Sequence, residues 1–303
     1  MSSGSIHVSV AGWEDRFLHS TKELITREKP STLILFRYVG YESWISENRI
    51  KVEALCGERS IRLLEESLEY EKPISSWKKI QNVLGNREFA GSKALVNLTT
   101  MPREAIWMTL RALQDNASEV DYIYYYPKKY SDSWLTKDHG PPRLLPQQSG
   151  YAMFGVPTVL LISVGYDAQR ANRLVHFFEP ERVLLGIYTG SPLSKSGHVR
   201  EELSRFTSSW SAENEVFELD ASSSDHGFSE LLKQARRFTN DSNVLLTSLG
   251  PKLSAVALYR LHRCFPQMGL VYVPSKRYNK DYSSGVGDST RGVLREVNEN
   301  RDG

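Results

Sequence analysis

The stretch Val8-Ser-Val-Ala-Gly-Trp-Glu14 decides the fold, because it recurs later in the chain as Leu161-Ile-Ser-Val-Gly-Tyr-Asp167. Each copy is an apolar run that ends in a glycine, an aromatic residue and an acid. Each is followed by an amphipathic run and a second apolar run, Leu33–Gly40 in the first copy and Val183–Gly190 in the second. Apolar runs that alternate with amphipathic ones are typical of strands followed by helices.

A second block of sequence repeats in the same order. Ala94–Arg103 ends in Thr-Thr-Met-Pro-Arg, and Val244–Lys252 ends in Thr-Ser-Leu-Gly-Pro-Lys. The apolar run that follows leads to Pro-Lys-Lys-Tyr130 in the first copy and to Pro-Ser-Lys-Arg-Tyr278 in the second. Any two strand–helix units share an apolar pattern, but the ordered recurrence of these polar motifs indicates that a whole unit is duplicated.

We therefore predict an α/β fold, a tandem duplication of a Rossmann-like half with a parallel sheet, the two halves being related by a pseudo-two-fold axis. A more polar helical region is expected in the middle of each half, at Ser60–Tyr70 and Phe228–Phe238. The predicted parts are a first half at 1–135, a turn-rich linker at 136–155, a second half at 156–282 and a polar, mobile C-terminal tail at 283–303.

Composition limits the possible partners. Lys and Arg number 38 and Asp and Glu number 36, so the net charge of +2 gives no overall field that would attract nucleic acid or a membrane. No apolar run approaches the roughly 20 residues that span a bilayer. Cys56 and Cys264 are far apart in the chain, and we expect both to be free thiols. These features favour a soluble, cytoplasmic protein without a membrane partner.

The loops after the first strand of each half are the first candidate site, since ligands of open α/β sheets bind at the carboxyl ends of strands. These loops are Gly12-Trp13-Glu14-Asp15-Arg16 and Gly165-Tyr166-Asp167. Glycine lets a ligand approach the backbone, an aromatic ring can stack on a base, and a carboxylate can bind a sugar hydroxyl. Alternatively, the acids are ordinary first-turn residues favoured by the helix dipole, and the rings pack over the sheet edge.

The Pro-cation loops are the second candidate site. Each joins hydroxyl groups, a proline at the expected first helical position and a cation, Arg103 or Lys252. Free N–H groups at a helix N-terminus beside a cation can bind an anion, whereas the simpler interpretation is a capped helix with solvated charges.

The basic turns that end in Tyr130 and Tyr278 could bind phosphate and stack a base, or could be solvated surface. The residues predicted to bind ligand are Gly12, Trp13, Arg16, Thr99, Thr100, Arg103, Gly165, Tyr166, Thr247, Ser248, Gly250, Lys252, Lys276, Arg277 and Tyr278.

Several catalytic motifs are absent from the sequence. There is no Walker phosphate loop, no Gly-x-Gly-x-x-Gly after a first strand, no Gly-x-Ser-x-Gly elbow and no paired spacing among the seven histidines. We expect neither a cofactor nor a metal. The carboxylates that could act as a nucleophile or base are Glu14, Asp15 and Asp167.

With these loops and the duplication in view, the chain resembles the CARF-like Rossmannoid sensors of prokaryotic defence, in particular the SAVED type, in which two CARF-like units are fused. The resemblance covers 5–135 and 156–282. Family members often carry Thr-Gly-Gly-Thr-Lys where this chain has Thr-Ser-Leu-Gly-Pro-Lys, so Gly250 and Lys252 match. The resemblance implies a pocket between the halves for a cyclic oligonucleotide whose phosphates meet Lys252 and Arg103. It also implies a separate effector protein, or cleavage of the ligand by the chain itself.

Three hypotheses follow. The leading one is a nucleotide-ligand-binding sensor that acts with a partner effector or as a homo-oligomer. The second is an enzyme of nucleotides or nucleosides, of N-glycosidase or ring-nuclease type. The third is a non-catalytic adaptor subunit whose exposed tryptophans contact partners, and burial of these tryptophans would weaken it. Nucleic-acid binding is disfavoured by the net charge, although Lys128-Lys129 and Lys276-Arg277 leave it open. The tryptophans in question are Trp44, Trp77, Trp134 and Trp210.

Overall fold

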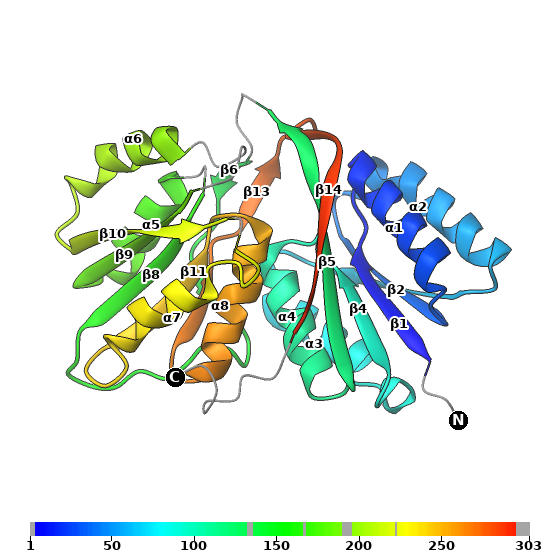
Figure 1. The fold of residues 1–303 in the computed structure, drawn as a ribbon, viewed down its shortest axis with the longest axis horizontal. Coiled ribbons are helices and arrows are strands. Elements are labelled where there is room, and N and C mark those ends of the chain that lie inside the picture. The colour runs from blue at the N-terminus through cyan, green and yellow to red at the C-terminus, as the bar shows by residue number, and fades with distance from the viewer. Residues whose placement is uncertain (1–3, 132–135, 166–167, 190–195, 222, 295–303) are drawn as a thin grey trace. The chain divides into compact units, whose positions relative to one another are not determined.

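The repeated strand–helix blocks form two separate sheets, one in each of two units (Figure 1). Unit 1 comprises the chain up to Lys137 together with the segment that begins at Tyr278, and unit 2 comprises Asp138–Arg277. The structure is a computed structural model, and it describes residues 4–131, 136–165, 168–189, 196–221 and 223–294.

Unit 1 is built on a six-stranded sheet in the order β14-β5-β4-β1-β2-β3. Strands β1 to β5 run parallel, and β14 runs antiparallel to β5. Helices α1 and α2 pack together on one face of the sheet, and α3 and α4 pack together on the other. The elements are β1 (Ser5–Val10), α1 (Asp15–Glu28), β2 (Thr32–Tyr38), α2 (Glu42–Glu58), β3 (Arg62–Leu68), α3 (Pro73–Leu84), a 3-10 turn (Arg87–Phe89), β4 (Lys93–Asn97), α4 (Arg103–Gln114), β5 (Glu119–Tyr130) and β14 (Ser283–Val293).

Unit 2 repeats this plan with a sheet in the order β10-β9-β8-β11-β12-β7. The neighbouring strands from β10 to β12 in this order are parallel to one another, and the edge strand β7 is antiparallel to β12. Two further strands, β6 and β13, pair with each other where the chain passes between the units. The elements are β6 (Thr136–His139), β7 (Arg143–Leu144), β8 (Thr158–Val164), α5 (Ala168–Phe178), β9 (Arg182–Thr189), α6 (Ser196–Thr207), β10 (Glu213–Asp220), α7 (Phe228–Arg236), β11 (Asn243–Ser248), α8 (Lys252–Cys264), β12 (Gly269–Tyr272) and β13 (Ser275–Tyr278).

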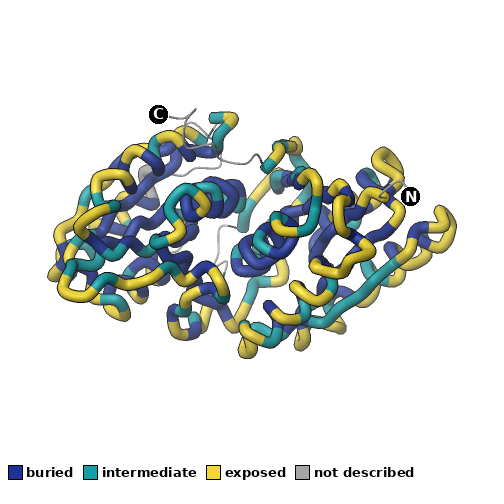
Figure 2. Tube along the Cα trace, turned by 90° about the horizontal axis from the view of Figure 1, so that it is seen from below, coloured by how far each residue is buried: buried dark blue, intermediate teal, exposed yellow. Residues whose placement is uncertain are grey.

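The central strands explain why the chain folds in this way. β2 and β8 are nearly continuous apolar runs, and all but one residue of each is buried. Strands that carry helices on both faces lose the alternation of apolar and polar residues, as parallel sheets generally do. The outer helix α2 buries only Ile45, Val52 and Cys56, and Figure 2 shows the contrast between buried strands and exposed outer segments. The predicted tandem duplication of a Rossmann-like α/β half is therefore confirmed.

One predicted helical region is wrong. Ser60–Tyr70 was expected to be helical, but Arg62–Leu68 form β3, which pairs in parallel with β2. Leu and Glu favour helices when isolated, yet backbone pairing with β2 overrides that preference. Because β3 is an edge strand, it tolerates the polar residues that suggested a helix. The corresponding prediction in unit 2 agrees with α7, Phe228–Arg236.

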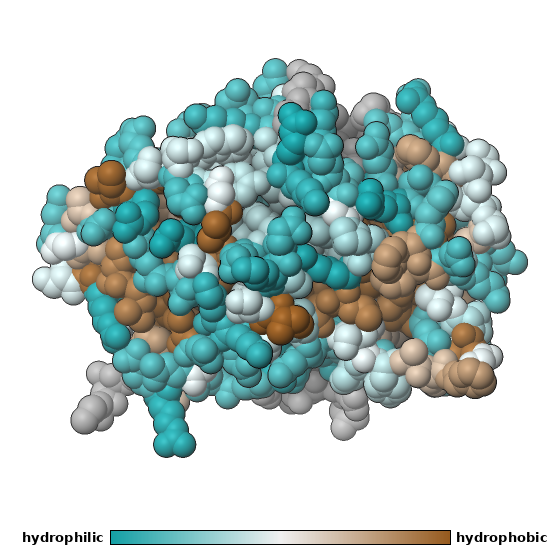
Figure 3. All heavy atoms as spheres, turned by 180° about the vertical axis from the view of Figure 1, so that it is seen from behind, coloured by the Kyte–Doolittle hydropathy of each residue, from teal (hydrophilic) through white to brown (hydrophobic). Residues whose placement is uncertain are grey.

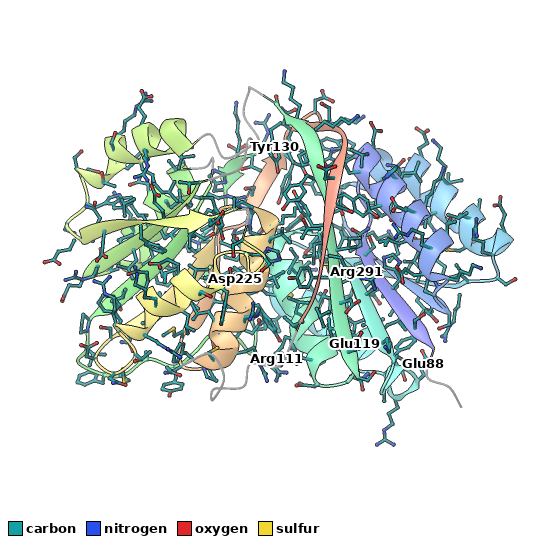
Figure 4. The ribbon with its side chains drawn as sticks, in the orientation of Figure 1. Glu88, Arg111, Glu119, Tyr130, Asp225 and Arg291 are labelled. Atoms are coloured by element: carbon teal, nitrogen blue, oxygen red, sulfur yellow. The ribbon has the colours of Figure 1, made fainter. Side chains whose placement is uncertain are left out.

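The expected mobile C-terminal tail is wrong for Ser283–Val293. These residues form β14, which pairs with β5 along most of its length and is interrupted by a bulge between Val286 and Ser289. An edge strand is held by backbone hydrogen bonds and needs few apolar side chains, so the polar sequence of this segment did not predict a strand. Arg291 of β14, labelled in Figure 4, also pairs with Glu28 and Asp121.

Two smaller differences concern strand limits. The residues interpreted as a basic turn ending in Tyr130 belong to β5, which continues to Tyr130 because β14 pairs with it. The turn-rich segment 136–155 contains the short strands β6 and β7.

The tryptophans proposed as partner contacts are mostly interior. Trp77 and Trp210 are 5% and 8% exposed, Trp44 is partly exposed, and Trp134 lies outside the described residues. The adaptor hypothesis therefore loses the support of Trp77 and Trp210. Figure 3 shows hydrophobic side chains gathered in patches between hydrophilic ones on one face of the molecule. None of the helices that the structure describes is long and apolar enough to cross a membrane.

Candidate functional site

The strand order of unit 1 reverses beside β1, and the loops that leave β1 and β4 meet there. A Cβ atom added at Gly12 would lie 2.8 Å from the Cβ atom of Thr100. The Thr100 hydroxyl donates to the Val10 carbonyl at 2.7 Å, and the Asn48 amide donates to the Gly12 carbonyl at 3.1 Å. The two predicted loops thus converge at the position where open α/β sheets bind ligands.

The β4 loop leads directly into α4. Pro102 is the N-cap, one residue before its expected position, and Arg103 is the first helical residue and partly exposed. Thr99 is buried, and its hydroxyl accepts from the Tyr125 backbone N–H at 3.2 Å. Thr99 therefore shapes the loop, whereas Arg103 is placed where a ligand could reach it.

Unit 2 has an even closer approach at its own reversal point. A Cβ atom at Gly165 would lie 1.9 Å from the carbonyl oxygen of Leu249, and one at Gly250 would lie 3.0 Å from the Ser163 hydroxyl. Only glycine fits at position 165, where the two backbones pass. Lys252 is the first residue of α8, is partly exposed and follows the N-cap Pro251, as Arg103 follows Pro102.

A buried serine cluster supports the β11 loop. The Ser163 hydroxyl donates to the Ser254 hydroxyl at 2.8 Å, and the Ser254 hydroxyl lies 2.6 Å from that of Ser248 and donates to the Pro251 carbonyl at 2.7 Å. Thr247 is also buried. These hydroxyls hold the loop in place.

Glu14 and Arg16 form a buried ion pair instead of an open site. Glu14 is 8% exposed and Arg16 is 2% exposed. The Tyr282 hydroxyl donates to Glu14 Oε1 and the Ser283 hydroxyl donates to Glu14 Oε2, each at 2.5 Å. The Arg16 Nε also donates to Oε2, at 3.0 Å. Arg16 also donates to the Tyr125 carbonyl at 2.9 Å. Both oxygens of Glu14 are engaged, which favours a structural role over catalysis.

The charges of this cluster are strongly coupled. Burial by itself would lower the pKa of the Arg16 guanidinium, but the Glu14 carboxylate, Tyr282 and Tyr124 together outweigh burial and raise that pKa above its ordinary value. Burial, reinforced by Glu14, raises the pKa of Tyr282 well above its ordinary value. Arg16 and Tyr282 therefore keep their protons at neutral pH.

A second buried arginine occupies the first turn of the corresponding helix in unit 2. Arg170 is 5% exposed; its Nε donates to His139 Nδ1 at 3.4 Å, and its guanidinium donates to the Ser275 hydroxyl. The duplication thus extends to a buried cation beside each first-strand loop.

The remaining predicted residues are more scattered. Asp15 is exposed in the first turn of α1, and Lys276 and Arg277 are exposed on β13, where Arg277 lies 3.3 Å from Asp138. Trp13 and Tyr278 belong to a group of ring contacts in unit 1. Tyr166 and Asp167 lie outside the described residues.

Arg37 was not predicted, although a lone cation at the end of the apolar run Leu33–Phe36 was a usable signal. The contacts of Tyr282 and Ser283 with Glu14 had no such signal, because that segment was interpreted as a tail. Among the described residues, no group of His, Cys, Asp and Glu is arranged to hold a metal ion.

The surface of unit 1 also has a hollow of about 430 Å³ at the amino ends of β2 and β3, away from the converging loops. Its lining residues are Ile25, Lys29, Pro30, Arg59, Ser60 and Ile61.

Comparisons with known proteins give a fold likeness but no family. No protein-family model and no curated protein matches the sequence. The fold is similar to a Type III CRISPR defence DNA nuclease activated by cyclic oligoadenylate, with a TM-score of 0.51 and 9% identity; the match covers 84% of this chain and 63% of that chain. This chain therefore spans less than two thirds of the nuclease's length. At this identity, the likeness concerns the fold alone.

Two other solved structures are more distant. One is the cytoplasmic domain of a prokaryotic cation chloride cotransporter, with a TM-score of 0.28 and 10% identity; the match covers 92% of this chain and 98% of that chain. The other is a putative universal stress protein from Pseudomonas aeruginosa UCBPP-PA14, with a TM-score of 0.27 and 12% identity; the match covers 89% of this chain and 92% of that chain. TM-scores this low do not indicate a shared fold or function.

Proposed function

We propose that this chain is a nucleotide-binding sensor module of a prokaryotic defence system, that its ligand is a cyclic oligonucleotide, and that it acts with a partner effector. One observation carries the proposal. In each unit, the loops from the first and fourth strands of the sheet meet at a glycine and place a cation, Arg103 or Lys252, at the start of the next helix.

The chemistry of these helix starts suits a phosphate. Neither N-cap, Pro102 or Pro251, supplies a side-chain cap to the first N–H groups of its helix. A cation in the first turn is disfavoured by the helix dipole, and an anion in front of it would offset that cost. Glycine backbones at the adjacent loop allow the close approach that a phosphate needs.

The comparison adds support of another kind. The nuclease with a similar fold is activated by cyclic oligoadenylate. The CARF-like resemblance of the Thr-Ser-Leu-Gly-Pro-Lys252 loop points to the same class of ligand. Binding is favoured over catalysis, because Glu14 is occupied by Arg16, Tyr282 and Ser283.

A thermal-shift screen against mono-, di- and cyclic oligonucleotides, followed by mass spectrometry of each mixture, tests the proposal. A ligand present at 100 times its dissociation constant stabilises the protein by about 2.7 kcal/mol, which raises its melting temperature measurably. We expect stabilisation by an intact cyclic oligonucleotide. No shift with any nucleotide would overturn the proposal, and a chemically altered ligand would replace the sensor with an enzyme.

A further inference from the structure

A cluster of five aromatic side chains lies in unit 1 beside the Gly12 loop. Trp13 stacks on Tyr41 with ring centres 5.6 Å apart, and Trp44 meets Trp13 edge-on at 4.9 Å. Tyr70 and Tyr278 lie 6.1 Å from each other, and each contacts Tyr41. We call these five residues the aromatic cluster.

The cluster is assembled from parts that are distant in sequence. Trp13 follows β1, Tyr41 is the N-cap of α2, Trp44 lies in its first turn, and Tyr70 follows β3. All these positions are at the carboxyl ends of parallel strands, where ligands of such sheets bind. Every ring of the cluster is partly exposed, not fully buried.

Two rings of the aromatic cluster are anchored by the rest of unit 1. The Trp13 indole N–H donates to the Lys280 carbonyl at 2.9 Å, and Trp13 and Tyr41 pack against the hydrophobic core that contains Ala11, Phe17 and Ile45. Rigid aromatic surfaces bind flat ligands with little loss of conformational freedom. Trp13 and Tyr41 are therefore positioned before any ligand binds.

Arg37 provides an independent observation beside the cluster. Its Nε is buried, and the residues that the structure describes offer it no hydrogen bond. Arg37 lies near the end of β2, on the same face of the strand as Leu33 and Leu35. The Ala11 N–H donates to the Phe36 carbonyl, so the end of β1 lies next to this part of β2. The same core contains Ala11, Leu33 and Leu35, and Trp13 and Tyr41 pack on it. A buried donor without an acceptor is unfavourable. Arg37 as a whole is partly exposed, so the accessible part of its side chain is within reach of a ligand.

We propose that the aromatic cluster and Arg37 bind the base of a purine nucleotide. The base lies against the exposed rings, and its ring nitrogen or carbonyl accepts from Arg37, as purine acceptors do from arginine. The inference deepens the proposed function, on which it rests for the identity of the ligand as a nucleotide: unit 1 would take the phosphate at the Gly12 and Arg103 loops and the base at the cluster.

Fluorescence titrations of the full chain can separate the two parts of this site. Trp13 and Trp44 belong to the cluster, so a stacked base should quench tryptophan emission. The probes are adenosine, guanosine, their 5′-monophosphates and ribose 5-phosphate. We expect both monophosphates to bind with quenching, and ribose 5-phosphate to bind more weakly without it.

The variants Trp44→Leu and Arg37→Gln should weaken binding of the monophosphates about tenfold and leave ribose 5-phosphate binding unchanged. Tyr151→Leu, which removes an exposed ring from unit 2, is the matched control and should change neither. Circular dichroism and melting temperature show whether each variant folds. If Trp44→Leu does not fold, the comparison of nucleosides with ribose 5-phosphate on the wild type still decides the matter.

The failures of the two proposals look different. If ribose 5-phosphate binds as tightly as the monophosphates and no nucleoside quenches, the aromatic site is overturned while the phosphate site stands. If adenosine or guanosine binds with quenching and ribose 5-phosphate does not bind, the aromatic site stands and the phosphate site fails. If no probe binds, the aromatic site is overturned, and the thermal-shift screen with cyclic oligonucleotides decides the phosphate site separately.

Discussion

Glu14 and Arg16 show how burial decides the role of a chemically attractive residue. A carboxylate after the first strand suggests a nucleophile, but here each of its oxygens accepts from Tyr282 or Ser283 and Arg16 pairs with it. Removing one partner of a buried ion pair leaves the other charge without compensation. The pair therefore ties the start of α1 to the start of β14.

The variant Glu14→Ala should lower the free energy of unfolding by about 3–5 kcal/mol, because Arg16 would remain buried without its acid. Urea denaturation followed by circular dichroism measures this. Glu47→Ala removes an exposed partner of Lys51 and should have no measurable effect. Equal stability of Glu14→Ala and the wild type would contradict the structural role.

His7 should make the protein sensitive to acid. Burial lowers the pKa of this histidine to about 4, and neither ring nitrogen has a hydrogen-bond partner among the described residues. Between pH 6.5 and 4 the unfolded chain binds a proton at His7 and the folded chain does not. The free energy of unfolding should therefore fall as the pH falls, by about 2 kcal/mol from pH 8 to pH 5.

Urea denaturation at these two pH values, on the wild type and on His7→Leu, tests this expectation. The variant should lose most of the difference, whereas His176→Leu, which removes an exposed histidine, should keep it. An unchanged pH dependence in His7→Leu would refute the assignment.

At the level of elements, the glycine loops were predictable and their partners were not. The repeated Gly-aromatic-acid motif located Gly12 and Gly165, and the parallel fold implied that their loops meet the Pro-cation loops. The contact of Tyr282 with Glu14 joins residues 268 positions apart and rests on a strand without apolar alternation. Neither local pattern nor repetition reports such a pairing.

Gly165→Ala should destabilise the protein by about 2 kcal/mol, because its methyl group would overlap the Leu249 carbonyl and the backbone has to move. Gly57→Ala, where the structure places nothing within 4 Å, should instead stabilise α2 by about 0.5–1 kcal/mol. Thermal melts of the two variants compare them. A Gly165→Ala protein as stable as the wild type would mean that the loops are not in contact.

The amides of β14 that pair with β5 should be protected from hydrogen exchange. Exchange followed by mass spectrometry of peptides that cover 283–293 measures this, with peptides from β5 as the reference. Immediate exchange throughout this segment would restore the prediction of a mobile tail.

At the level of the whole molecule, the duplication predicted from sequence accounts for both sheets. Each unit has the same strand order and adds one antiparallel edge strand that the repeat does not contain, β14 in unit 1 and β7 in unit 2. The repeat thus predicted the parallel cores. It could not predict the edges, because their pairing partners come from segments outside the repeated blocks.

We propose that the loops at Arg103 and Lys252, one in each unit, bind a nucleotide. Calorimetric titration of cyclic oligoadenylate into the double variant Arg103→Ala/Lys252→Ala tests this. The control is Arg111→Ala/Arg263→Ala, which removes cations from the last turns of the same two helices. We predict at least about a tenfold loss of affinity in the first double variant and none in the control. Affinity unchanged within about twofold in the first variant would show that these two cations do not bind the ligand.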